Sequence, residues 1–300
     1  MNKLGPTIKK IRIIKGLSQK QVYTNIISRS FANRFESGTN DIQSEKFLMI
    51  LDNLGISPSE FQYINNNYEL PMAEQLLAKI NYLYETHAFK TLSNWLKQHK
   101  ESHNVQIQIV SGYAEVLLSS YSYHRFPLSK NIQMLMLHLL NEKSWTLQEI
   151  RMVKILIPII ATHEEFNINI ETITNRIEEN YKHYLTKYAD PFQISNELIN
   201  YYGVVLQNYL NTKNYQAAYG LRNKFNLDGL FLDWNGQISK QLWLAVWELY
   251  FGNYELGRDT LIKIIDFKSM FQISFSLNID AIFKIRVADS KAYRFTKKIK

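Results

Sequence analysis

The sequence predicts an all-α protein in which a small five-helix domain precedes a longer domain of helical repeats. Three observations predict this fold. Apolar residues recur at helical spacing from end to end, short capping signals punctuate the first 64 residues, and no segment alternates convincingly as a strand. The composition, 46% hydrophobic and 21% charged over 300 residues, is that of an ordinary globular chain and excludes a disordered or low-complexity protein.

The first three helices follow from their boundary residues. Helix one carries apolar residues at helical spacing and stops at Gly16. Ser18 caps helix two, and Gln21 three residues later completes a capping box. Either Ser28 or Ser30 opens helix three. The turn before it contains no glycine, so the start of helix three can be placed only to within about one residue.

The next two helices complete the small domain. Helix four covers about 44–54 and ends at Gly55, and helix five begins at Ser57, which a proline follows at the first helical position. An Asn triplet and a proline then predict a linker. We therefore predict a helix-turn-helix-sized domain at 1–64, a linker at 65–71 and a repeat domain at 72–300.

A weak internal repeat lies in the second half. The pairs Asn214-Tyr215 and Asn253-Tyr254 are 39 positions apart, each between two apolar-striped helices. Small residues, Ala218 and Gly257, stand three positions after each Tyr, as close helix packing requires. The pattern resembles a tetratricopeptide-like solenoid. Generic antiparallel helix pairs are the alternative interpretation.

Charge is concentrated at the N-terminal end. Residues 1–40 carry eight basic side chains and one acid, Glu36, although the whole chain has a net charge of only +8. This asymmetry predicts a polyanionic partner for the first domain.

Several function classes are excluded or disfavoured. The chain has no cysteine, which excludes disulfides, thiolate metal sites and a cysteine nucleophile. His99 and His103 have ligand-like spacing but lack a third ligand, and no phosphate loop or nucleophile elbow occurs. The longest apolar run, 155–161, is too short to cross a bilayer, and no signal-peptide core is present. We expect a cytoplasmic protein without metal, cofactor or enzymatic activity, and no membrane partner.

The stretches 12–19 and 28–38 together resemble the helix-turn-helix of the phage-repressor, or XRE, type. That resemblance implies a third helix in the DNA major groove and a structural salt bridge between Arg12 and Glu36. Gln19 would meet a phosphate, and Arg29 could make a bidentate contact to guanine. The complete set of expected DNA-binding residues is Gln19, Ser28, Arg29, Ser30, Asn33 and Arg34.

The whole chain resembles the Rgg and PrgX type of peptide-pheromone receptor, within the Rap/NprR/PlcR/PrgX/Rgg group. The resemblance is carried by the shortened turn at 23–30, by the run at 51–61 and by the repeat domain that follows. It implies a quorum-sensing transcription regulator, controlled by a short signalling peptide on the concave face of the repeats. A short recognition helix reads few base pairs, so we also expect a homodimer on a palindromic operator, with RNA polymerase as a further possible partner.

Peptide contacts are predicted from residue type alone, because Asn and Arg side chains hold peptide backbones and aromatic rings form pockets. The candidates are Arg151, Asn200, Asn208, Tyr201, Trp243 and Trp247. Two alternatives stay open at this point: a regulator whose repeat domain docks a protein and senses no peptide, and an adaptor with a vestigial DNA-binding domain.

Overall fold

The computed structural model describes residues 3–120, 127–163, 168–270 and 278–299, and every regular element within these ranges is a helix. The chain divides into two compact units, Met1–Lys79 and Ile80–Lys300. The first contains α1 (Leu4–Ile14), α2 (Gln19–Tyr23), α3 (Arg29–Glu36), α4 (Ser44–Leu54) and α5 (Pro58–Asn65). Helix α6 (Met72–Glu85) spans the division, and the predicted boundaries at 64 and 72 stay a prediction.

The second unit continues with fourteen further helical segments in the described residues. They are α7 (Phe89–His99), α8 (Val105–Ser120), α9 (Lys130–Asn141), α10 (Leu147–Met152), η1 (Val153–Ile155), α11 (Leu156–Thr162), α12 (Ile170–Tyr181), η3 (Lys182–Tyr184), α13 (Ile194–Asn211), α14 (Tyr215–Gly220), α15 (Arg222–Phe225), α16 (Trp234–Phe251), α17 (Tyr254–Ser269) and α18 (Ile279–Ile299). The all-helical prediction is confirmed for these residues.

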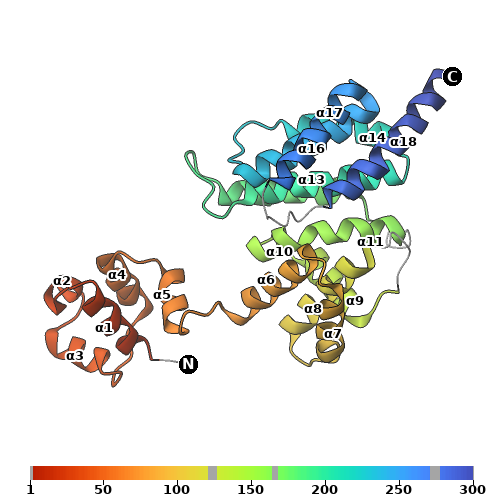
Figure 1. The fold of residues 1–300 in the computed structure, drawn as a ribbon. Coiled ribbons are helices and arrows are strands. Elements are labelled where there is room, and N and C mark those ends of the chain that lie inside the picture. The colour runs from red at the N-terminus through yellow and green to blue at the C-terminus, as the bar shows by residue number, and fades with distance from the viewer. Residues whose placement is uncertain (1–2, 121–126, 164–167, 271–277, 300) are drawn as a thin grey trace. The chain divides into compact units, whose positions relative to one another are not determined.

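Helices α1 to α5 form a small bundle around one apolar core (Figure 1). The core residues are Ile8, Ile11, Val22, Tyr23, Ala32, Phe35, Ile50, Leu51, Leu54, Ile56 and Phe61. The helices start at the predicted caps: Ser18 forms a complete capping box with Gln21, and Ser28, rather than Ser30, caps α3. Gly55, at φ 61°, ends α4 in the left-handed region.

Helices α1 and α3 approach very closely at Gly5. A Cβ atom placed on Gly5 would lie 1.7 Å from the backbone oxygen of Phe35, a residue on the buried face of α3. Only glycine leaves room for that carbonyl group. The position of α3 against the bundle therefore depends on this residue.

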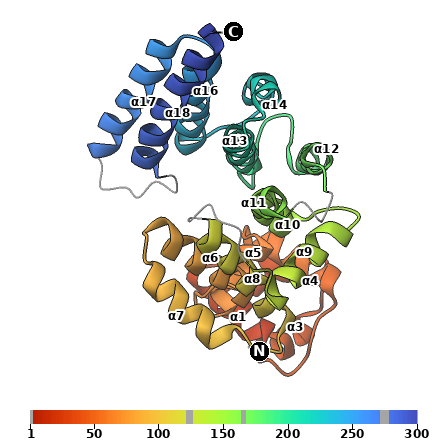
Figure 2. The same cartoon turned by 90° about the vertical axis from the view of Figure 1, so that its right-hand side faces the viewer.

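The Asn-Tyr repeat corresponds to two matching helix starts. The side chain of Asn214 accepts a hydrogen bond from the backbone N–H of Ala217, and Asn253 accepts one from Leu256. Each asparagine thus caps the second helix of a pair. Gly257 lets α17 lie against α16, since a Cβ there would be 2.6 Å from the backbone oxygen of Ala245. Figure 2 shows α16, α17 and α18 side by side.

Helix α18 is attached to the ends of two other helices by arginines. The buried guanidinium of Arg286 donates to Asn211 Oδ1 at 2.7 Å, at the C-terminus of α13. Arg294 donates to the backbone oxygens of Leu249 and Gly252 at 2.7 and 2.6 Å, at the C-terminus of α16. Cationic groups at helix C-termini satisfy carbonyls that lack partners inside the helix.

Candidate functional site

Glu36 is the centre of a hydrogen-bond network in the first unit. Arg12 donates from Nε to Oε1 at 2.6 Å and from Nη2 to Oε2 at 2.9 Å, which makes a bidentate ion pair between α1 and α3. The Tyr23 hydroxyl also donates to Oε1 at 2.7 Å, and Gln19 Nε2 donates to Oε2 at 2.9 Å. Glu36 is only 4% exposed, so four donor groups from α1 and α2 hold one buried carboxylate of α3.

These contacts shift the pKa values of the groups that make them. Burial alone would raise the pKa of Glu36, but the hydrogen bonds from Arg12, Gln19 and Tyr23 outweigh burial and lower it. Burial raises the pKa of the Tyr23 hydroxyl, and the adjacent Glu36 carboxylate raises it further. The network therefore stays ionised at Glu36 and protonated at Tyr23 near neutral pH.

This pKa shift predicts acid sensitivity in the first unit. A carboxyl group whose pKa is lower in the folded chain contributes stability above its unfolded value of about 4.3 and loses it as the pH falls through the folded value. We expect native NMR cross-peaks of residues 4–65 to be constant from about pH 7 to 5 and to weaken below about pH 4. In Glu36→Gln this acid transition should shrink. An unchanged transition in that variant would assign it to other groups.

One face of α3 is exposed and carries the predicted DNA-binding side chains. Ala32, Phe35 and Glu36 are buried, whereas Arg29 and Arg34 are exposed. Ser30 and Asn33 are exposed with them, and the Ser28 hydroxyl is used in capping by accepting from the Phe31 N–H. The Arg34 guanidinium lies 5.8 Å from the Phe31 ring centroid. The structure thus brings these side chains together on one short helix.

Gln19 has a different position from the others. Its side-chain Nε2 donates to Glu36 Oε2 at 2.9 Å and to Asn33 Oδ1 at 3.0 Å. Both amide hydrogens are therefore used inside the domain, and the remaining amide oxygen is an acceptor, which cannot bind a phosphate oxygen. Gln19 fixes α2 to α3, and a phosphate contact through its side-chain amide would require these bonds to break.

The turn between α2 and α3 is made without glycine. Asn25 takes φ 65°, the left-handed region in which asparagine is tolerated better than other non-glycine residues. The side chains of the next two residues, Ile26 and Ile27, pack against the core. This places the start of α3 at Arg29.

The predicted peptide contacts separate into buried and accessible groups. Trp243 and Tyr201 are 0% and 1% exposed, and the Tyr201 hydroxyl is hydrogen-bonded to Thr174 Oγ1 at 2.8 Å. Both rings are buried in the helical unit, so the prediction that they contact a peptide is corrected. Rings at this helical spacing pack in the core here. Asn200 and Asn208 are half-buried.

Arg151 and Trp247, the other two candidates, lie at different places in the unit. Arg151 is exposed and makes a long contact of 3.4 Å to the backbone oxygen of Phe192. Trp247 is 6% exposed, and its indole nitrogen donates to the backbone oxygen of Tyr219 at 3.0 Å. Trp247 therefore holds the backbone of Tyr219 through this hydrogen bond and has little exposed surface for a ligand.

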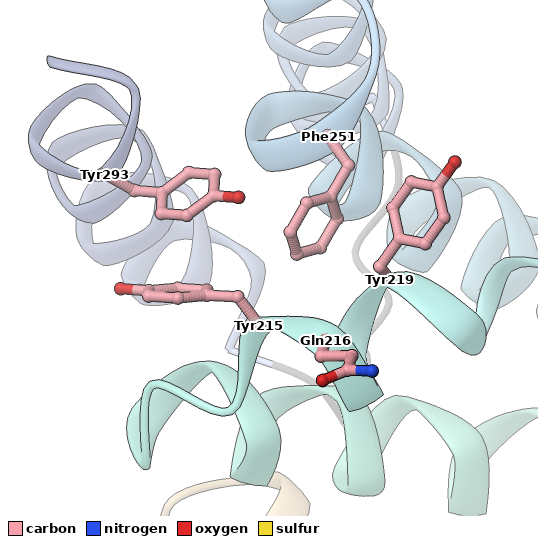
Figure 3. A pocket seen from close by; sticks show the side chains of 5 residues that line it. All are labelled: Tyr215, Gln216, Tyr219, Phe251 and Tyr293. Atoms are coloured by element: carbon pink, nitrogen blue, oxygen red, sulfur yellow. The ribbon is translucent and has the colours of Figure 1, made fainter. Parts of the chain in front are cut away.

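Tyr219 belongs to an aromatic pocket of about 300 Å³ where α14, α16 and α18 meet (Figure 3). The pocket is lined by Tyr215, Gln216, Tyr219, Phe251 and Tyr293. The Tyr215 and Tyr293 rings are 4.2 Å apart, and the Phe251 ring lies 5.7 Å from that of Tyr293. The Asn-Tyr repeat pointed to Tyr215, and Tyr219 follows it on the same helix. No sequence signal placed Phe251 and Tyr293 beside them, because these two residues come from α16 and α18.

Comparison with known proteins agrees with the two parts of the fold. Residues 8–61 match the helix-turn-helix family. A protein from Listeria monocytogenes EGD-e, described as a transcriptional regulator, is 19% identical with a TM-score of 0.68, and the match covers 100% of this chain and 99% of that one.

Two further solved structures, one of a pheromone receptor and one of a PrgX complex, have the same fold. The receptor Rgg2 of Streptococcus dysgalactiae is 18% identical, with a TM-score of 0.61 over 98% of this chain and 99% of that one. PrgX in complex with cCF10 is 12% identical, with a TM-score of 0.63 over 96% and 98%. The resemblance to the Rgg and PrgX fold, including its helical repeat domain, is confirmed at the level of the fold.

Taken together, the α3 surface and the family match describe a helix-turn-helix domain in the first unit. In the described residues, no helix is both long and apolar enough to span a bilayer.

Proposed function

We propose that this chain is a cytoplasmic, homodimeric, sequence-specific transcription regulator controlled by a short signalling peptide on its helical unit. The observation that carries the proposal is the exposed face of α3, where Arg29, Ser30, Asn33 and Arg34 lie together. The buried Arg12–Glu36 pair holds this face in place. Base edges in the major groove are read by side chains presented in this way.

Control by a peptide is supported by two findings. The structures with the same fold include a pheromone receptor and a complex of PrgX with cCF10. On the helical unit of this chain, Asn200 and Asn208 remain partly accessible on α13, and an asparagine amide can pair with the N–H and C=O groups of an extended peptide.

The DNA part of the proposal is tested by selecting duplexes from a random-sequence pool with the full chain. Selected and scrambled duplexes are then titrated at ~50 and ~200 mM salt, because phosphate contacts weaken with salt while base readout is retained. We expect an enriched palindrome and a preference for it of about 10³-fold or more. Arg29→Ala should reduce this preference roughly 5- to 150-fold, since a bidentate base contact contributes about 1–3 kcal/mol.

Lys263→Ala is the matched control. Lys263 is exposed on α17, outside the proposed interface, and its substitution removes one positive charge as Arg29→Ala does. The variant should therefore prefer the selected duplex as strongly as the wild type. If the pool yields a site and Arg29→Ala binds it as selectively as the wild type, Arg29 does not contact a base. A pool with no enriched sequence would contradict sequence-specific binding, and an enriched site without two-fold symmetry would contradict the dimer.

A further inference from the structure

The rings that line the aromatic pocket are themselves packed against buried rings. The indole of Trp247 lies 5.4 Å from the Tyr219 ring and 5.5 Å from the Phe251 ring, measured between centroids. The Tyr250 ring lies 6.3 Å from that of Tyr215 in the same way. Trp247 and Tyr250 are only 6% and 3% exposed. Because buried rings support the lining rings, the walls hold their positions and the cavity is preformed.

The pocket is also open to solvent. Tyr219 is 59% exposed, Gln216 is exposed on the same helix, and Tyr215 and Phe251 are half-buried. Ring surface that stays in contact with water is unfavourable, and surfaces of this kind mark sites where a partner binds. A cavity of about 300 Å³ is at the lower limit of ligand pockets, so it suits one side chain better than a large cofactor.

The second Asn-Tyr pair shows how the same surface is closed in the next repeat. There the guanidinium of Arg294 lies over the Tyr254 ring, 5.8 Å from its centroid, so that α18 covers this tyrosine with its own side chain. At the equivalent Tyr215, α18 supplies Tyr293 instead, with the two rings 4.2 Å apart, and the pocket beside them stays open. The first of the two repeats therefore has room for a group from outside the chain.

The charges around the pocket favour an uncharged occupant. None of the five described residues that line it is charged. Asp289 and Glu248 each precede a lining residue by about one turn, and both are already paired. Asp289 lies 3.6 Å from Arg286, and Glu248 lies 3.3 Å from Arg222. The Arg222 guanidinium also lies 4.9 Å from the centroid of Trp247. A bound cation would lack an unpaired carboxylate here and would be repelled by this guanidinium.

An aromatic side chain fits these features best. Rings in proteins pack offset or edge to face at centroid distances of about 4.5–7 Å. Phe251 already makes such edge contacts with Tyr219 and Tyr293, both at 5.7 Å. A further ring would extend this arrangement and gain contacts that an aliphatic side chain lacks.

The pocket also offers one polar group for the chain that carries the ring. Gln216 lines it from the same helix as Tyr215 and Tyr219 (Figure 3). Within the described part of the protein its side-chain amide makes no hydrogen bond. An amide can pair with both the N–H and the C=O of a peptide backbone. Rings together with this amide suit a residue of a peptide better than a free hydrocarbon ring.

We propose that the aromatic pocket binds an aromatic side chain, Phe, Tyr or Trp, of the signalling peptide. This inference rests on the proposed function, because it names a residue class of the peptide that the helical unit would bind. The rings of the pocket contact the bound ring, and Gln216 orients the backbone beside it. Because the lining residues come from α14, α16 and α18, the bound ring contacts all three helices.

The first test needs no signalling peptide. The full chain is titrated with the blocked amino acids acetyl-Phe-amide, acetyl-Leu-amide and acetyl-Lys-amide, and binding is followed by saturation-transfer NMR. We expect the Phe compound to bind about two- to tenfold more tightly than the Leu compound, which is the gain of an aromatic pair beyond its buried area. The Lys compound should bind most weakly.

Three variants locate this binding. Tyr219→Ala removes one wall of the pocket and should abolish the preference for the Phe compound. The hydrogen bond from Trp247 is kept in this variant, since it goes to the backbone oxygen of residue 219. Tyr219→Phe keeps the wall and should bind as the wild type does. Tyr188→Ala is the matched control, because Tyr188 is 80% exposed and lies outside the pocket.

The second test exposes the full chain to a synthetic pool of random octapeptides, and the bound peptides are sequenced by mass spectrometry. We expect Phe, Tyr or Trp to be enriched over Leu and Ile at one position, again by about two- to tenfold. The wild type and Tyr188→Ala should show this enrichment, and Tyr219→Ala should not.

The two tests distinguish failure of this inference from failure of the proposed function. Equal binding of the Phe and Leu compounds, tightest binding of the Lys compound, or a preference that Tyr219→Ala keeps would overturn the inference. Octapeptides retained without an aromatic position would also overturn it and leave peptide control standing. If the protein bound the Phe compound but retained no octapeptide, peptide control would be contradicted, and the assignment of this pocket to the signalling peptide with it.

Discussion

In Glu36→Ala, we expect the backbone amides of residues 4–65 to exchange with solvent roughly 150- to 5,000-fold faster than in the wild type. The substitution leaves the guanidinium of Arg12, 13% exposed, without its carboxylate, and removing one partner of such a pair costs about 3–5 kcal/mol. Gln19 and Tyr23 lose their acceptor at the same time. The lost free energy is a large share of the total stability of a typical domain, which is about 5–15 kcal/mol.

Hydrogen exchange of the full chain, followed by mass spectrometry, measures this effect for each unit separately. Peptides from the second unit should be unaffected, since the network lies within residues 12–36. Glu69→Ala is the control, because Glu69 is exposed and has no resolved contact. Equal exchange in Glu36→Ala and the wild type would mean that the network contributes nothing to stability.

The second large effect is expected for Gly5→Ala. The new methyl group would stand 1.7 Å from the Phe35 oxygen, an atom of the α3 backbone that cannot rotate away. Helix α1 must therefore move from α3, and overpacking of this kind costs about 3 kcal/mol or more. Because α1 carries Arg12 and α3 carries Glu36, the displacement should also weaken DNA binding.

Gly220→Ala is the matched control for Gly5→Ala. Nothing lies within 4 Å of a Cβ at Gly220, which ends α14, so alanine should be neutral or slightly stabilising there. Urea unfolding and duplex titration of the two variants give the comparison. If Gly5→Ala unfolds at the same urea concentration as the wild type, α1 can move away from α3 without a loss of stability.

The fold was largely predictable because its signals are local. Ser18 with Gln21, Gly55 at the end of α4, and the two asparagines at 214 and 253 each act on their own turn of helix, so the sequence around them is enough. The start of α3 was ambiguous between two serines. The structure resolves it through Asn25, whose left-handed backbone conformation has no unique sequence signature.

The functional surfaces were only partly predictable, for a physical reason. Composition cannot tell a ring on a buried helix face from one on an open face, so Trp243 could be named a candidate for peptide contact although it lies in the core. The aromatic pocket was missed because Tyr215, Phe251 and Tyr293 are far apart in the sequence and only packing brings them together.

Under the proposed function, the bond between Gln19 and Asn33 bears on which bases α3 would recognise. The amide oxygen of Asn33 already accepts this bond, so the side chain has one acceptor lone pair left beside its two N–H groups. Arg29 and Arg34 have no acceptor at all, and serine contributes the one group that can act both ways. The recognition face is thus rich in donors, and its complement is a base edge with two acceptors, as guanine presents through O6 and N7. Under the proposed function, such a face would favour half-sites that contain guanine over those that present the amino group of cytosine.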